Sequence, residues 1–173
     1  QVEFDGSRVD CCELVQTKDA SEVEDHKIEL IGPDIDEFEV GSKHSIAYVV
    51  EVAGKSMQPD FEPVFERKFH SYLNCIEGVM HTGQRDMIRI RVSKEAFNAG
   101  FRAKHFGEVL YAQVKNEFEA VVDKCQVKIY TNPEDCTKIR HEIAIPVFDK
   151  RDERLSTMTD ESVPVYYSCI MCQ

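Results

Sequence analysis

The stretch Ser45-Ile-Ala-Tyr-Val-Val-Glu-Val52 decides the fold class of this chain. It is nearly continuous in apolar and β-branched residues, which is typical of a strand buried on both faces. A sheet that contains such a strand needs other elements packed on both sides. The stretch therefore predicts a layered α/β domain with a mixed β-sheet flanked by helices.

The sequence on the C-terminal side of this stretch alternates between helical and strand periodicity. Phe61, Phe65 and Phe69 recur at intervals of four, and Ile88, Ile90 and Val92 at intervals of two. The same periodicities predict, in order, an amphipathic helix over 61–76, a strand over 88–92, a short helix after Ser93, a helix over 106–118, a strand over 125–129 and a helical segment over 133–145 that Pro146 ends or kinks.

On the N-terminal side, residues 1–43 are predicted to form a strand arm. Residues 12–16 and 26–31 have strand composition and are separated by an acidic turn, so we expect a hairpin or a strand pair. Residues 1–150 are expected to form a single domain. The mixed charges of 149–154 suit a solvated helix face or a linker.

The composition is that of a globular protein with an acidic surface. Hydrophobic residues make up 42% of the 173 residues, and 32 acidic against 21 basic residues give a net charge of -11. That charge argues against nucleic acid or an anionic membrane as the main partner. The absence of an apolar run of roughly 20 residues and the scattered cysteines, seven in number, predict a cytoplasmic protein in a reducing compartment.

Basic side chains are concentrated in one short part of this acidic chain. Arg85, Arg89, Arg91 and Arg102 lie there together with His81. If Arg89 and Arg91 share one strand face, their guanidinium groups and that of Arg85 could converge on phosphates. The alternative is a solvated strand edge whose arginines pair with carboxylates, and spacing alone favours that alternative.

The cysteines divide into one pair with ligand spacing and several isolated ones. Cys169-Ile-Met-Cys172 places two thiols one turn apart, which fits a metal or two corners of one cluster but also occurs in redox disulfides. Cys75 and Cys125 lie on apolar faces and are predicted to be small core residues.

Several motifs appear in an order that resembles one enzyme family, CO-methylating acetyl-CoA synthase. The resemblance extends from about Val9 onward and is carried by Ile31-Gly-Pro-Asp-Ile-Asp36, Val52-Ala-Gly-Lys-Ser-Met-Gln58, His81-Thr-Gly-Gln-Arg85, Arg91-Val-Ser-Lys94, His105-Phe-Gly-Glu-Val-Leu110, Asp152-Glu-Arg154, Thr159-Asp-Glu-Ser-Val163 and Tyr167-Ser-Cys-Ile-Met-Cys-Gln173. It implies a central domain that leads, over residues 151–173, into the start of a cluster-binding domain.

The resemblance implies an acyltransferase that joins a methyl group, carbon monoxide and coenzyme A at a cluster. Its cofactors are a 4Fe-4S cubane and two nickel ions, and Cys169 and Cys172 match the first two cubane ligands. The remaining ligands match no residue of this sequence, so no catalytic residue is assigned and we expect no complete active site in this stretch alone.

The resemblance also implies that the central domain docks coenzyme A near the stretch Gly78-Val-Met-His-Thr-Gly-Gln-Arg85. The residues predicted to contact it are Met80, His81, Gln84, Arg85, Arg91 and Arg102. Met80 departs from the family pattern, because several members carry tryptophan there and this chain has none.

The partners implied by the resemblance are a carbon monoxide dehydrogenase subunit, a corrinoid iron–sulfur protein and ferredoxin, with no nucleic acid and no membrane. Two alternatives stay open. One is a non-catalytic coenzyme A-binding or scaffold module of the same fold. The other is a dimer in which Cys169 and Cys172 of two chains complete a zinc or cluster site.

Overall fold

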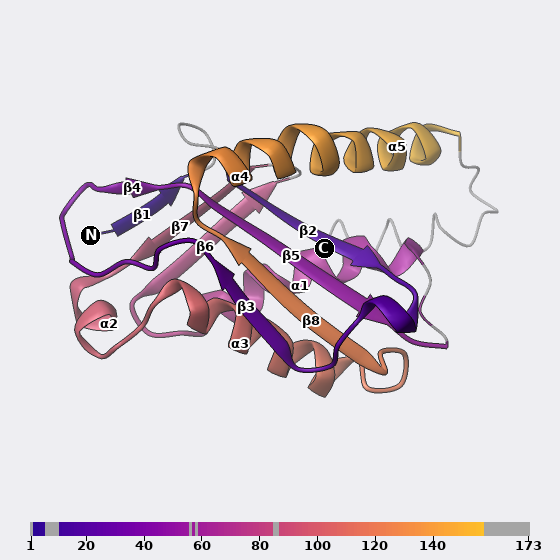
Figure 1. Cartoon of the computed structure of the whole chain (residues 1–173), viewed down its shortest axis with the longest axis horizontal. Coiled ribbons are helices and arrows are strands. Elements are labelled where there is room, and N and C mark those ends of the chain that lie inside the picture. The colour runs from indigo at the N-terminus through magenta and orange to yellow at the C-terminus, as the bar shows by residue number, and fades with distance from the viewer. Residues whose placement is uncertain (1, 6–10, 56, 58, 85–86, 158–173) are drawn as a thin grey trace.

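The computed structural model describes residues 2–5, 11–55, 57, 59–84 and 87–157 (Figure 1). In the described part, eight strands form two four-stranded sheets, of order β4-β1-β7-β6 and β2-β5-β8-β3. The strands are β1 Val2–Asp5, β2 Cys11–Thr17, β3 Lys27–Ile31, β4 Lys43–His44, β5 Ile46–Ala53, β6 Val79–Gln84, β7 Met87–Val92 and β8 Lys124–Tyr130.

The helices follow the strands in the alternating order that the sequence predicts. They are the short 3-10 turns Ala20–Glu22 and Pro59–Phe61, then α1 Glu62–Asn74, α2 Lys94–Asn98, α3 Ala103–Glu117, α4 Pro133–Ile139, a π-helical turn Arg140–Ala144 and α5 Ile145–Ser156. The α/β class is therefore confirmed. Ser93 caps α2 as expected, since its hydroxyl accepts a hydrogen bond of 3.1 Å from the Ala96 N–H.

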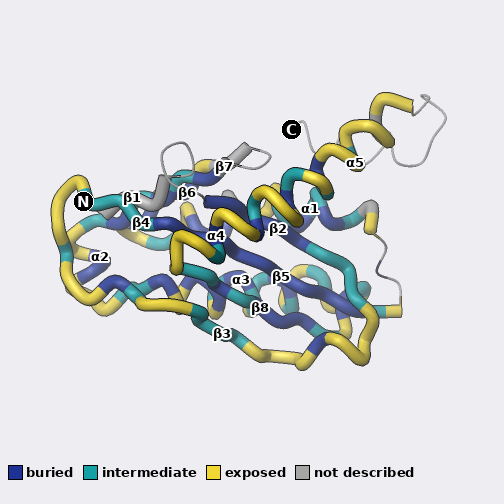
Figure 2. Tube along the Cα trace, turned by 45° about the horizontal axis from the view of Figure 1, so that its top comes forward, coloured by how far each residue is buried: buried dark blue, intermediate teal, exposed yellow. Residues whose placement is uncertain are grey.

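The sheet β2-β5-β8-β3 has on the whole the longer strands and is called the larger sheet, and the sheet β4-β1-β7-β6 is called the smaller sheet. Strand β5 is an inner strand of the larger sheet, and every one of its residues is buried (Figure 2). It pairs in parallel with β2 and antiparallel with β8, which in turn pairs in parallel with β3, so the sheet is mixed. The prediction of a strand buried on both faces is confirmed.

Two helical layers cover the larger sheet, one on each face (Figure 1). Helices α1 and α3 pack with the side chains of one face into the main core, which includes Tyr48, Phe65 and Phe106. The segment from α4 to α5 packs on part of the other face around Leu14, Val49 and Phe148. The alternation of side chains along β2 and β5 explains why neighbouring residues belong to different cores.

The prediction that residues 12–16 and 26–31 pair, as a hairpin or a strand pair, is wrong. Strands β2 and β3 lie at opposite edges of the larger sheet, separated by β5 and β8. Each finds a parallel partner far along the chain, because β5 and β8 supply the long buried strands against which both can pack. Composition identified the two strands but held no information about which neighbour each one takes.

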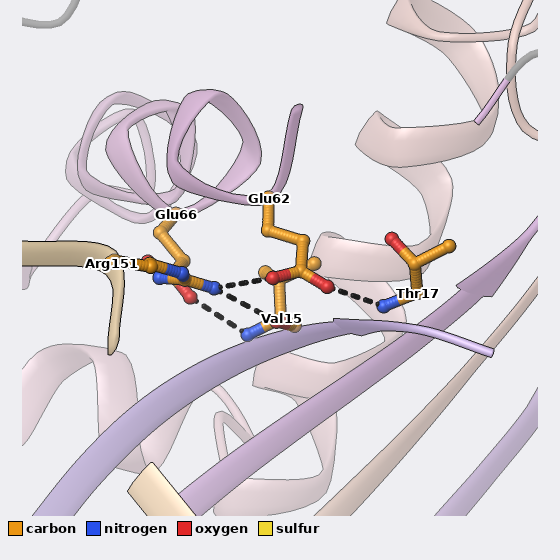
Figure 3. Close-up of polar contacts among 5 residues, drawn as sticks. All are labelled: Val15, Thr17, Glu62, Glu66 and Arg151. Atoms are coloured by element: carbon orange, nitrogen blue, oxygen red, sulfur yellow. Dashed lines mark hydrogen bonds and ion pairs between the residues drawn. The ribbon is translucent and has the colours of Figure 1, made fainter. Parts of the chain in front are cut away.

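The free edge of β2 is closed by side chains of α1 and α5 (Figure 3). The N–H groups of Val15 and Thr17 donate to Glu66 and Glu62, over 2.9 and 2.7 Å. Arg151 donates to both carboxylates, each over 2.8 Å, and to the carbonyl of Val15. Unpaired backbone groups on an edge strand are thereby satisfied without another strand.

Helix α5 continues across the charge run that was predicted as a solvated helix face or a linker. Its start follows the π-helical turn, and Pro146 is its second residue. The helical run from Pro133 to Ser156 is unbroken, so the helix does not end at Pro146. The Ile145 N–H donates to the Arg140 carbonyl five residues back, and such a π-helical turn is a common way for a helix to adjust where a backbone hydrogen bond is missing. The helix places Arg151 in a largely buried position, whereas Asp149 and Asp152 are exposed. The boundary at residue 150 stays a prediction.

Candidate functional site

The candidate site lies on one face of the smaller sheet and is formed by strands β6 and β7. Their antiparallel register places Met80 opposite Arg91 and Thr82 opposite Arg89. Residues directly opposite one another in such a pair point to the same face. Met80 is 44% exposed and Thr82 is exposed, while the two arginines are half-buried. We call these four residues the arginine face.

The two strands beside β7 carry different residue types opposite Arg89 and Arg91. Strand β1 runs on the far side of β7 and places Glu3 opposite Arg91 and Asp5 opposite Arg89. Strand β6 offers the uncharged residues Met80 and Thr82 instead. In the register, acidic residues of β1 and uncharged residues of β6 stand opposite the two arginines.

His81 points away from the arginine face. Its side chain is fully buried on the opposite side of β6, and its Nε2 lies 2.9 Å from a carboxylate oxygen of Glu13 on β2. The alternation of strand residues, with Met80 and Thr82 on one face, requires this orientation. In this structure no surface of His81 is open to a ligand.

Arg102 is engaged at the end of α2. Its Nη1 donates to the carbonyl oxygens of Phe97 and Phe101, each over 2.8 Å. Its guanidinium carbon lies 3.7 Å from the centre of the Phe97 ring, a cation–π contact. The side chain closes the helix end rather than extending over β6 and β7.

The structure thus brings together Met80 and Arg91 among the predicted coenzyme A residues, and adds Arg89. Gln84 ends β6, with its side chain outside the described part, and Arg85 also lies outside the described residues. Arg89 and Arg91 share one face of β7, as the alternation predicts, whereas Thr82 gains its place opposite Arg89 from strand register, which the sequence did not reveal.

Two family models match the chain in succession. One is described as the CO dehydrogenase/acetyl-CoA synthase complex beta subunit and matches residues 1–136. The other is described as the C-terminal part of the ACS/CODH beta subunit and matches residues 148–173. The chain belongs to the CO dehydrogenase/acetyl-CoA synthase beta-subunit family. The resemblance stated from the motifs is confirmed.

Curated relatives match over almost the whole chain. It is 47% identical over 172 residues to the carbon monoxide dehydrogenase/acetyl-CoA synthase subunit alpha of Moorella thermoacetica, covering 99% of this chain and 24% of that protein. It is 45% identical to the acetyl-CoA decarbonylase/synthase complex subunit beta 2 of Methanocaldococcus jannaschii, covering 99% and 36%. The corresponding beta subunit of Archaeoglobus fulgidus is 37% identical, covering 99% and 33%. The chain therefore spans only a quarter to about a third of the length of these relatives.

The cysteines that carry the predicted metal role, Cys169 and Cys172, lie outside the described residues. Within the described ranges, no group of three or more histidine, cysteine and acidic side chains could hold a metal. Burial raises the pKa of the Cys12 thiol, and that of Cys125 to about 12, as expected of thiols enclosed in the core.

Two smaller predictions about the described residues are also decided. Cys125 is a core residue as predicted, but Cys75 is exposed at the end of α1, so its assignment to the core is wrong. None of the described helices is both long and apolar enough to span a membrane.

Proposed function

We propose that this chain is part of an acetyl-CoA synthase, which joins a methyl group, carbon monoxide and coenzyme A into acetyl-CoA. The observation that carries the proposal is the succession of the two family models along one chain. Relatives at 47% and 45% identity bear names that include acetyl-CoA synthase or decarbonylase/synthase.

The segment after α5 is proposed to supply cluster ligands. Cys169 and Cys172 have the spacing and the soft thiolate chemistry that iron–sulfur clusters take. When bound, a nickel–iron–sulfur cluster supplies the metal at which the three reactants are joined. The proposed partners are a carbon monoxide dehydrogenase subunit, a corrinoid iron–sulfur protein as methyl donor, and ferredoxin.

The described domain is proposed to dock coenzyme A on the arginine face. Arg89 and Arg91 offer guanidinium groups that suit phosphate oxygens, which bind planar cations through paired hydrogen bonds. Met80 beside Arg91 offers an exposed apolar side chain to the adenine or the pantetheine arm. Arg85 and Gln84, next along the chain, are proposed to extend the contact.

Calorimetric titration of the complete gene product with coenzyme A tests this docking site. An Arg85→Ala, Arg91→Ala double variant should bind at least about tenfold more weakly than wild type, since each lost charge-assisted contact is worth about 1.5–3 kcal/mol. Arg67→Ala, Lys150→Ala is the matched control, because both side chains are exposed, on α1 and α5, and their loss changes the net charge by the same amount without altering the arginine face.

Pantetheine lacks the nucleotide phosphates of coenzyme A. Its binding therefore distinguishes a loss of phosphate recognition from a general weakening of ligand binding. The double variant should bind pantetheine as wild type does. If wild type and the double variant bind coenzyme A alike, or if wild type does not bind it, the arginine face is not the docking site.

A further inference from the structure

We propose that Glu13 and His81 are positioning residues that hold strand β6, and with it the arginine face, in place against the larger sheet. The inference rests on the proposed docking of coenzyme A at that face. It assigns to His81 a function other than direct contact with the ligand.

Strand β6 has few connections that could fix its position. It is an edge strand of the smaller sheet and has a ladder only with β7 in the described part of the chain. Its outer side meets α1, where the His81 N–H donates to Asn74 Oδ1 over 2.6 Å. A strand held on one side by a ladder can shift or twist unless other contacts restrain it.

The Glu13–His81 contact joins two different sheets. Glu13 lies on β2 of the larger sheet, and the separation of Glu13 Oε2 from His81 Nε2 is 2.9 Å. Their side chains are 5% and 0% exposed. A buried polar pair of this kind adds little net stability compared with apolar packing, but it demands one geometry.

The restraint acts directly on the residues of the proposed site. His81 lies between Met80 and Thr82, which face the opposite way and stand opposite Arg91 and Arg89. Fixing the His81 side chain therefore fixes the position of Met80 and Thr82 on β6 relative to the arginines of β7. Ligand contacts that depend on such placement are sensitive to displacements of about 1 Å.

Three variants test the positioning role in the complete gene product. His81→Leu removes the contact but leaves the Glu13 carboxyl buried. The double variant Glu13→Met, His81→Leu removes both polar groups, a replacement that is often close to neutral for stability. Glu13→Gln keeps an acceptor oxygen for the imidazole and is the conservative variant. Tyr72→Phe is the control for stability alone, because it removes a partly buried hydrogen bond of 2.6 Å to Glu117 between α1 and α3.

We expect the double variant to stay folded and to bind coenzyme A on the order of tenfold more weakly, with Glu13→Gln close to wild type and Tyr72→Phe unchanged. The methyl resonance of Met80 in protein labelled with ¹³C-methyl methionine should shift in the double variant and not in Tyr72→Phe. Equal affinities and an unmoved Met80 resonance in the double variant would overturn the proposal.

The two measurements separate the inference from the function on which it rests. If wild type itself does not bind coenzyme A, the docking site fails, and the Met80 resonance alone decides whether Glu13 and His81 position β6. A shifted resonance then supports the positioning role, and an unmoved one refutes it.

Discussion

Arg151 reaches back from α5 to lie 2.8 Å from Glu66 of α1, and the same guanidinium lies 2.8 Å from Glu62. Both carboxylates also accept backbone N–H groups of β2, so one cation stabilises the contact of two helices and an edge strand (Figure 3). The family model for the C-terminal region begins at residue 148, so Arg151 anchors the first part of that region to the rest of the domain.

Loss of Arg151 should therefore be costly. Arg151→Met leaves two largely buried carboxylates without their cation, and we expect the free energy of unfolding at pH 8 to fall by about 3 kcal/mol. Urea denaturation measures this change. Lys150→Met, at an exposed neighbouring position on α5, should change it by less than about 0.5 kcal/mol. Similar effects of the two substitutions would show that the network is not a stabilising anchor.

The pH dependence of stability should carry a contribution from Glu66. Burial raises the pKa of this carboxyl from 4.5 to about 7, against the opposing effect of Arg151. The folded state thus holds the proton more tightly than the unfolded chain does, so the stability contributed by Glu66 is largest below about pH 4.5 and falls as the pH rises to about 7.

Glu66→Gln, which cannot ionise, is the variant that isolates this contribution. The free energy of unfolding of wild type relative to the variant should be higher at pH 5 than at pH 8, by chemical denaturation at both values. A difference that does not change between the two pH values would argue against a raised pKa.

Gly54 should tolerate no side chain. A Cβ at this position would fall on the carbonyl oxygen of Val121 and within 3.2 Å of the Asp123 backbone nitrogen. The turn after β5 is held there by the Asp123 N–H, which donates to the Ala53 carbonyl over 2.9 Å. Because backbone cannot move aside as a side chain can, Gly54→Ala should lower the free energy of unfolding by about 3 kcal/mol or more.

Gly41→Ala is the matched control for that substitution. Gly41 has a φ of 79° but nothing within 4 Å of an added Cβ, so only its left-handed backbone is disfavoured. We expect a loss of about 1–2 kcal/mol. Thermal denaturation of both variants measures these losses. If Gly54→Ala lowered the stability less than Gly41→Ala does, the steric account would be refuted.

The elements of this fold could be predicted wherever local periodicity carried the information. The buried run of β5, the alternation of β7 and the four-residue spacing of α1 and α3 each matched the structure. The pairing of β2 with β5 could not be predicted, because strand composition does not specify a partner. The contact of Arg151 with Glu62 joins residues far apart in sequence, and within its charge run Arg151 looks like any solvated residue.

The candidate site was predictable in part for the same reason. Alternation along 79–84 places His81 on the face opposite Met80. The prediction that both residues contact coenzyme A followed the motif Gly78–Arg85 and did not use this alternation. The position of Arg91 next to Met80 could be predicted only from the register between β6 and β7, which the sequence does not give. To predict that Cys75 is exposed, one would need to know where α1 ends. The spacing of apolar residues locates a helix end only to within a few residues.

The docking of coenzyme A on the arginine face can be measured most directly with a fluorophore placed there. These 173 residues contain no tryptophan. Met80→Trp therefore places an indole beside Arg91, and Val40→Trp places one at a residue that is 77% exposed outside that face, each compared with the unsubstituted protein. Coenzyme A should change the fluorescence of the Met80→Trp protein saturably, and adding Arg91→Ala should weaken the apparent affinity. No change in the Met80→Trp protein, or an equal change in the Val40→Trp protein, would contradict the proposed site.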